Sequence, residues 1–101
     1  MIVYNVTIQI ENEVHDDWLE WMKNVHIPEV MNTGMFLENR MLIVLGSEES
    51  EGKTYSVQYI CKSMKEYEQY RNSFAPALQE KHSSRYANKF VAFRTLLEVV
   101  K

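Results

Sequence analysis

The chain has 101 residues, 46% hydrophobic and 25% charged, which are the proportions of one globular domain spanning residues 1–101. Its formal net charge of −3 offers no basic surface to nucleic acid or to an anionic membrane, and no apolar run approaches the ~20 residues that cross a bilayer. Cys61 is the single cysteine, so a disulfide within the chain is excluded and we expect Cys61 to pack in the core. Together with the lack of a signal peptide, this favours the cytoplasm.

Residues 2–10 alternate apolar and polar side chains with the two-residue period of a β-strand. One side carries Ile2, Tyr4, Val6, Ile8 and Ile10, and the other carries Val3, Asn5, Thr7 and Gln9. This pattern predicts a strand whose apolar side packs on helices and whose polar side is left uncovered by them.

Helical spacing follows a polar turn at residues 11–13. The apolar stripe consists of Val14, Trp18, Trp21, Met22 and Val25. We interpret the two tryptophans as packing residues rather than as an aromatic ligand site. Pro28 lacks the N–H that a helix interior needs, so a kink or restart is expected near residues 26–28. Gly34 is expected to end the element with a left-handed cap.

Two strands and an intervening hairpin loop are predicted next. Residues 35–45 form one strand and Lys53 to Cys61 form the other, with residues 47–51 as a solvated acidic loop between Gly46 and Gly52.

A second helical region and a last strand complete the chain. Ser63 and Glu66 have the spacing of a capping box, Pro76 interrupts the helix that follows, and a further helical segment runs to about Tyr86. In the last strand, residues 89–100, two sets alternate: Val91, Phe93, Leu97 and Val99 against Phe90, Ala92, Arg94 and Glu98.

The predicted element order is β-α-β-β-α-β, so the fold class is α+β with the ferredoxin-like arrangement. Right-handed crossovers would place the helices on one face of a four-stranded antiparallel sheet. The polar residues expected on the opposite face are Asn5, Thr7, Gln9, Glu38, Arg40, Ser56, Gln58 and Arg94. The apolar residues expected beside them are Phe36, Leu42, Val44, Ile60, Phe90 and Leu96.

This uncovered face has three interpretations: solvent wets it, a second copy packs on it sheet to sheet around a cavity, or it binds RNA. We favour the homodimer, because an apolar patch of this size argues for a partner and two-fold association is the commonest oligomer. RNA-binding sheets of this topology present stacking aromatics on the central strands within a basic surround. Here the central strands present small polar side chains and the chain is acidic, so we predict no nucleic-acid partner.

His26 is the candidate catalytic residue. It falls within the apolar arc of the first helix where Pro28 disrupts the backbone, and an imidazole can act as acid, base or ligand near neutral pH. The alternative is a structural histidine that caps the broken backbone. His26 and Glu29 have a His-x-x-Glu spacing, but no third ligand converges on them in the sequence, so we predict neither a metal site nor a cofactor.

Two arginines and a second histidine also have the chemistry of ligand-binding residues. His82, Arg85 and Tyr86 lie three or four residues apart and could hold a carboxylate, or else form an exposed polar face. Arg94, on the face expected to be uncovered, requires a partner, for which Glu38 and a bound anion are the two options.

Six segments of the chain resemble a family of short bacterial proteins that carry a domain of unknown function. They are Tyr4–Thr7, Trp18–Met22, His26–Glu29, Thr33–Phe36, Ala75–Leu78 and Lys89–Glu98. The resemblance covers nearly the whole chain and implies a family without an activity.

More distantly, the layout and the Trp-x-x-Trp, His-x-Pro and Gly-x-Phe motifs resemble the dimeric α+β barrel superfamily. Its members include cofactor-independent monooxygenases, lactone isomerases, haem-degrading enzymes and ligand-binding stress proteins. The haem-degrading branch combines an asparagine, a tryptophan and a histidine. Asn5 and His82 would supply two of these, but Trp18 and Trp21 belong to the first helix, so that activity is not carried over.

We therefore expect a homodimeric α+β barrel that binds a small organic molecule in a cavity beside the sheet. The expected ligand-binding residues are Asn5, Thr7, Gln58 and Arg94, with Arg40, His82 and Arg85 as further candidates. A second hypothesis is a cofactor-independent monooxygenase or isomerase in which His26 is the base. A third is a non-catalytic interaction module.

Overall fold

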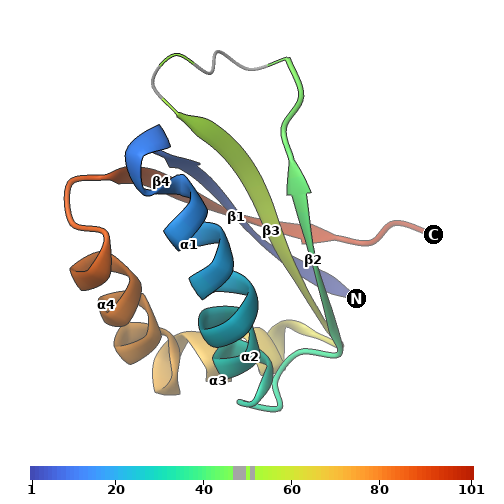
Figure 1. Cartoon of the computed structure of the whole chain (residues 1–101). Helices are drawn as coiled ribbons and strands as arrows, with labels where there is room; N and C mark the ends of the chain where they lie inside the picture. The colour runs from blue at the N-terminus through green and yellow to red at the C-terminus, as the bar shows by residue number, and fades with distance from the viewer. Residues whose placement is uncertain (47–49, 51) are drawn as a thin grey trace.

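The protein is built on a four-stranded antiparallel sheet with the strand order β2-β3-β1-β4. The computed structural model describes residues 1–46, 50 and 52–101. The strands are β1 (Ile2–Ile10), β2 (Glu38–Ile43), β3 (Lys53–Cys61) and β4 (Phe90–Glu98). The helices are α1 (His15–Trp21), α2 (Ile27–Met31), α3 (Met64–Ser73) and α4 (Ala75–Arg85), all on one face of the sheet (Figure 1).

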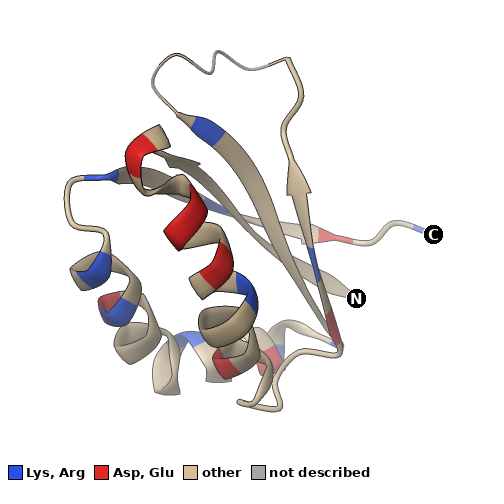
Figure 2. Cartoon of the chain, in the orientation of Figure 1, with Lys and Arg blue, Asp and Glu red and all other residues tan. Residues whose placement is uncertain are grey.

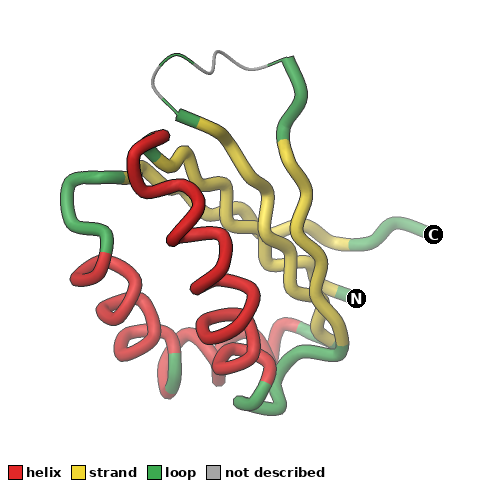
Figure 3. Tube along the Cα trace, in the orientation of Figure 1, coloured by secondary structure: helices red, strands yellow, loops and turns green. Residues whose placement is uncertain are grey.

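The ferredoxin-like topology is thus confirmed. The first strand, β1, is a central strand that pairs antiparallel with both β3 and β4. The last strand, β4, forms the edge of the sheet beside it, so the first and last strands of the sequence are neighbours. The tube drawing shows the same two layers, with every described helix on one side of the strands (Figure 3). None of the described helices combines the length and the apolar character needed to cross a membrane.

The hydrophobic core lies between the sheet and the helices. The apolar side of β1 is buried, as predicted, and β3 contributes Tyr55, Val57, Tyr59 and Cys61 to the same layer. Trp18 has no exposed surface and Cys61 is fully buried, which confirms that both are packing residues. Gly52 approaches the end of β1 so closely that an added Cβ would lie 2.3 Å from the carbonyl oxygen of Ile10, so a side chain there would displace the backbone.

The first helical region contains the break predicted at Pro28, and the break takes the form of a π-helical turn, η2 (Met22–His26). The N–H of Ile27 bonds to the carbonyl of Met22, five residues back. This wider turn places one extra residue between buried positions, so the buried side continues at Ile27 and Val30. Val25, predicted for the apolar stripe, is instead 40% exposed. The cap at Gly34 is confirmed by its φ of 78°.

The second helical region divides where Pro76 was expected to interrupt it. Ser63 is the N-cap of α3, as the spacing predicts, but its hydroxyl donates to the Glu66 carboxylate and makes no capping bond to the backbone, so the reciprocal bonds of a capping box are not formed. Pro76 then lies in the first turn of α4, where a missing N–H removes no helical bond. The strand predicted over residues 35–45 is shorter, because Phe36 turns into the core against Tyr4 and Tyr59. Residues 47–49 and 51 of the predicted acidic loop lie outside the described residues.

The register of β4 corrects the predicted composition of the sheet faces. Val6 pairs with Arg94 and Ile10 pairs with Phe90, so Arg94, Phe90 and Leu96 lie on the helix side of the sheet. Their predicted place on the opposite side was wrong, as was that of Phe36. Apolar residues occupy both sides of β4, so composition alone favoured the wrong one. The uncovered face instead carries Val91, Phe93 and Leu97 from β4, with Asn5, Thr7, Ser56, Gln58, Arg40 and Leu42 from the other strands.

Candidate functional site

A cavity of about 40 Å³ lies between the sheet and the helices. Most of its wall is apolar, and its polar side chains are Tyr4, His26, Tyr59, Tyr70, Gln79, His82, Ser83 and Arg94. This volume has room for a few water molecules. We call it the histidine cavity, because two histidines from different helical regions meet there with their ring centroids 5.8 Å apart.

His26 is the last residue of the π-helical turn, which directs its ring toward the histidine cavity. The ring stacks on Trp21 with a centroid separation of 5.0 Å. Its Nδ1 is buried and has no hydrogen-bond partner among the described residues. Burial outweighs the opposing effect of Glu29 and, with a smaller contribution from Lys81, lowers the pKa of His26 to about 4. His26 is therefore neutral at pH 7 and carries a ring nitrogen whose hydrogen-bonding capacity is unmet.

His82 comes from α4 and is held by a hydrogen bond from the indole Nε1 of Trp18 to its Nε2, 2.9 Å away. Because an indole N–H only donates, Nε2 must be the unprotonated nitrogen, and neutral His82 carries its proton on Nδ1. Burial, together with the neighbouring His26 and Arg94, lowers the pKa of His82 to about 4. The core tryptophan thus fixes both the orientation and the tautomer of this imidazole.

Arg94 reaches the same cavity from the edge strand β4. Its Nε donates to the hydroxyl oxygen of Tyr4 at 3.0 Å, which orients the guanidinium. Among the described residues, Arg94 forms no ion pair. Glu38, proposed from sequence as its partner, lies on β2 at the other edge of the sheet and on the opposite face. Arg94 and Ser83 are both exposed while lining the cavity, so the mouth of the cavity opens between β4 and α4.

The polar residues predicted with Arg94 lie on the other side of the sheet. There the side chains form a hydrogen-bonded row across three strands: Arg40 Nε donates to Gln58, Gln58 to Ser56, Ser56 to Asn5, and Asn5 to Thr7. The structure therefore brings Asn5, Thr7, Gln58 and Arg40 together, but separates them from His26, His82 and Arg94 by the thickness of the sheet.

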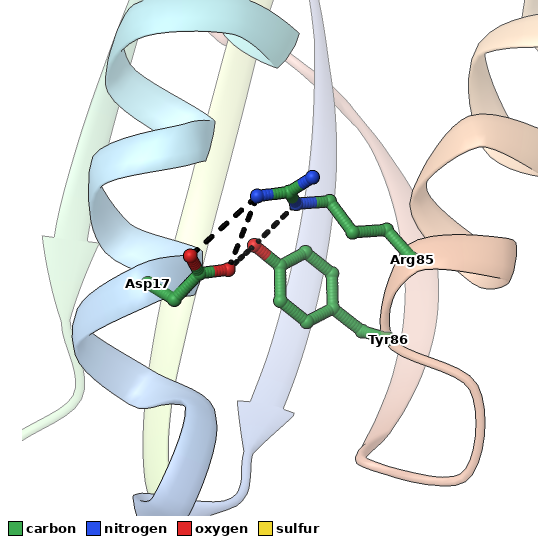
Figure 4. A network of polar contacts seen from close by, with 3 residues as sticks. All are labelled: Asp17, Arg85 and Tyr86. Carbon is green, nitrogen blue, oxygen red and sulfur yellow. Dashed lines mark hydrogen bonds and ion pairs between the residues drawn. The ribbon is translucent and has the colours of Figure 1, made fainter.

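Arg85 lies outside the histidine cavity and joins α4 to α1. Its Nη2 lies 3.3 Å from Oδ2 of Asp17, and the Tyr86 hydroxyl donates to the same oxygen at 2.8 Å (Figure 4). The guanidinium also lies over the ring of Trp21, 5.5 Å from its centroid. Acidic positions follow one another along α1 opposite basic positions on α4 (Figure 2). Arg85 thus has an acidic partner on α1, whereas Arg94 forms no ion pair with any described residue.

Sequence reasoning missed Tyr4, Gln79 and Ser83 as cavity residues. A signal was available on α4, because Gln79, His82, Ser83 and Tyr86 follow helical spacing along one face. Glu29, three residues after His26, forms an ion pair with Lys81 at 2.7 Å. Within the described part of the chain, no group of three or more His, Cys, Asp or Glu side chains is placed to hold a metal ion.

Solved structures share this fold at low sequence identity. HapK from Hahella chejuensis is 12% identical with a TM-score of 0.72, and the match covers 99% of this chain and 93% of that one. A mutant of MhuD with two manganese protoporphyrin IX molecules bound per active site is 20% identical with a TM-score of 0.67, covering 100% and 96%. A dimeric ferredoxin-like protein from an uncultured marine organism is 18% identical with a TM-score of 0.63, covering 99% and 97%.

Identities this low show a common fold and leave the activity open. No curated protein matches the sequence. A family model does match, and it covers almost every residue. The chain belongs to the family described as Domain of unknown function (DUF4286), whose model matches residues 1–100.

Proposed function

We propose that this protein binds a small organic molecule in the histidine cavity and does so as a homodimer. One observation carries the proposal: two neutral imidazoles and an arginine without an ion-pair partner among the described residues line the same cavity. Such a combination does not stabilise a packed core, because burying a polar group without a hydrogen-bond partner is energetically unfavourable.

The contrast with His15 strengthens this proposal. His15 is also buried, but its Nε2 is 2.7 Å from the Tyr55 hydroxyl and its Nδ1 is 2.8 Å from Asp16 Oδ1. That histidine is satisfied within the chain and serves the structure. Leaving Nδ1 of His26 unsatisfied costs about 1–3 kcal/mol, and a ligand that supplies the missing hydrogen bond would recover it.

The size of the cavity indicates a small ligand. Pockets that enclose drug-sized molecules measure roughly 300–1,000 Å³, whereas this cavity measures about 40 Å³. A porphyrin of the kind bound by the MhuD mutant would require the helices to separate from the sheet. We therefore propose a ligand of a few non-hydrogen atoms, or one whose remainder extends through the mouth between β4 and α4.

The uncovered face supports the homodimer. Val91 and Phe93 are 65% and 63% exposed, and Leu42 and Leu97 add further apolar surface around the hydrogen-bonded polar row. A second copy of the chain is the occupant that we propose, because two structural neighbours that match nearly the whole chain are described as dimeric ferredoxin-like proteins. Two such sheets packed face to face would leave both histidine cavities and their helices on the outside.

Native mass spectrometry of protein purified without additives tests both parts of the proposal. We expect the mass of a dimer with a small co-purifying molecule. Ala92→Leu, which adds volume to the cavity wall, should release the molecule but keep the dimer. The matched control is Ala77→Leu, at an exposed position of α4, which should keep both. A monomer would contradict the homodimer, and an unchanged adduct in Ala92→Leu would place the ligand elsewhere.

His26 also favours a second candidate function, a cofactor-independent monooxygenase or isomerase. Its unpartnered, neutral imidazole can accept a proton from a bound substrate, which is the role of a general base. Turnover of enolisable or phenolic compounds should then depend on pH and disappear in His26→Ala, while circular dichroism shows the variant folded. Turnover that survives in His26→Ala would exclude this role. A dimer whose cavity variants change nothing would instead be an interaction module.

A further inference from the structure

We propose that the histidine cavity selects small organic carboxylates, and that Arg94 is the residue that determines this selectivity. This inference rests on the proposed function and adds the chemical class of the ligand. It begins from the charges of the cavity wall. Among the described residues that line the cavity, none is an aspartate or glutamate, and Arg94 is the charged one. A cavity with one positive charge and no compensating acid favours an anion over a neutral molecule.

Three cations near the cavity-forming helices have acidic partners. Lys81 pairs with Glu29, Arg85 with Asp17 and Lys89 with Glu13. Arg94 instead bonds through Nε to a neutral phenol, and its two Nη groups have no partner among the described residues. A guanidinium with both Nη groups available matches the two oxygens of a carboxylate, which it can hold bidentately.

His82 supplies a second donor beside this charge. Trp18 occupies its Nε2, so the proton of the neutral ring is on Nδ1 and cannot move to the other nitrogen without losing the indole bond. His82 is therefore restricted to donating from Nδ1, as an anion requires. Phe90 lies edge-on to the His82 ring with a centroid separation of 4.5 Å, and with the other apolar residues of the wall it suits a short hydrocarbon tail. A carboxylate with a short hydrocarbon chain would pair with the donors Arg94 and His82 and pack against the apolar residues of the wall.

Titration of propionate and propionamide, followed by the amide resonances of cavity residues in NMR spectra, tests the proposal. The two probes have the same shape and differ in charge. We expect propionate to bind at least tenfold more tightly than propionamide. Arg94→Gln should weaken propionate at least tenfold and leave propionamide unchanged. Arg94→Lys, which keeps the charge, should retain the preference in reduced form, and Arg85→Gln should behave as the unmodified protein.

The outcomes separate the two proposals. Equal affinity for the two probes, or propionate binding that Arg94→Gln leaves unchanged, would overturn the carboxylate selectivity while the cavity remained a binding site. If neither probe shifts the cavity resonances and no molecule co-purifies, both proposals fail. If Arg85→Gln weakens propionate as much as Arg94→Gln does, the anion binds to surface charge and the selectivity of the cavity is refuted. Melting curves of each variant confirm that the comparison is made between folded proteins.

Discussion

The two faces of the sheet contain polar groups in opposite states. On the uncovered face, Asn5, Ser56 and Gln58 satisfy one another in a hydrogen-bonded row that extends from β2 to β1. On the helix side, the buried Nδ1 of His26 has no hydrogen-bond partner among the described residues, and Arg94, exposed at the cavity mouth, forms no ion pair with them. Polar groups that satisfy one another need no ligand, whereas unsatisfied ones are what a ligand could pair with. The helix side of the sheet is thus the better functional candidate.

The largest difference expected between the two faces is in the free energy of unfolding that their side chains contribute through packing. Ile10 points to the helix side and has no exposed surface, while its neighbour Gln9 points to the uncovered face. Ile10→Ala should lower the free energy of unfolding by about 4 kcal/mol, because it leaves a cavity in the core. Gln9→Ala should change it by no more than about 0.5 kcal/mol. Urea unfolding measures both, and losses of similar size would show that the uncovered face is as tightly packed as the core.

The pH dependence of stability should come from the helix side. The pKa of His26 and of His82 is held at about 4 in the folded protein, mainly by burial, whereas an unfolded histidine titrates near 6.5. The unfolded chain therefore binds protons first as pH falls. The contribution of each neutral histidine to the free energy of unfolding should be fully present above pH 6.5 and be lost between pH 6.5 and 4, by roughly 3 kcal/mol for one histidine.

Urea unfolding at several pH values checks this, with His82→Gln as the informative variant. Glutamine keeps an acceptor for the Trp18 indole but does not titrate, so the pH dependence should become shallower. Matching slopes for the two proteins would show that His82 does not contribute.

In the proposed homodimer, association should depend on the uncovered face. Phe93→Lys introduces a charge at a position that is 63% exposed in the single chain, and burying that charge between two sheets is unfavourable. We expect the dimer dissociation constant to rise at least tenfold, which corresponds to about 1.4 kcal/mol. Val25→Lys, on the outer surface of the helical layer, is the control. Sedimentation equilibrium distinguishes them, and equal dissociation constants would remove the sheet from the interface.

The smallest effect expected is on the polar row. Ser56 donates to Asn5 and accepts from Gln58, so Ser56→Ala removes the central member of the row. The free energy of unfolding should fall by about 1 kcal/mol, the typical net value of hydrogen bonds that water can replace. Chemical denaturation at pH 7 measures it. A loss of several kcal/mol would mean that the row is sealed from solvent, as it would be beneath a partner sheet.

Much of the fold could be predicted because its signals are local. The alternation in β1, the bounds of β3, the N-cap at Ser63 and the break near Pro28 each depend on residues close together in the sequence. Strand β4 could not be assigned a face in this way, since apolar side chains lie on both of its sides. Its face is set by pairing with β1, about 90 residues away, which places Arg94 opposite Val6.

The sequence singled out only some of the residues that line the cavity, and not their arrangement. His26, His82 and Arg94 were named as candidates, but Arg94 was placed on the wrong face of the sheet. Their meeting depends on a register that local patterns do not encode, and on a hydrogen bond between Trp18 and His82, 64 residues apart. Nor could spacing reveal that Arg85 has Asp17 as its partner, because that contact joins helices from the two halves of the chain.

The π-helical turn at Met22–His26 behaves as a one-residue insertion in an otherwise regular helix. In a regular α-helix each residue advances about 100° around the axis, so one extra residue would rotate everything that follows it away from the buried side. The wider turn absorbs that extra residue, and Trp18 and Met22 before it share the core side with Ile27 and Val30 after it. His26 therefore lines the cavity from the same side of the helical region as Met22 and Val30.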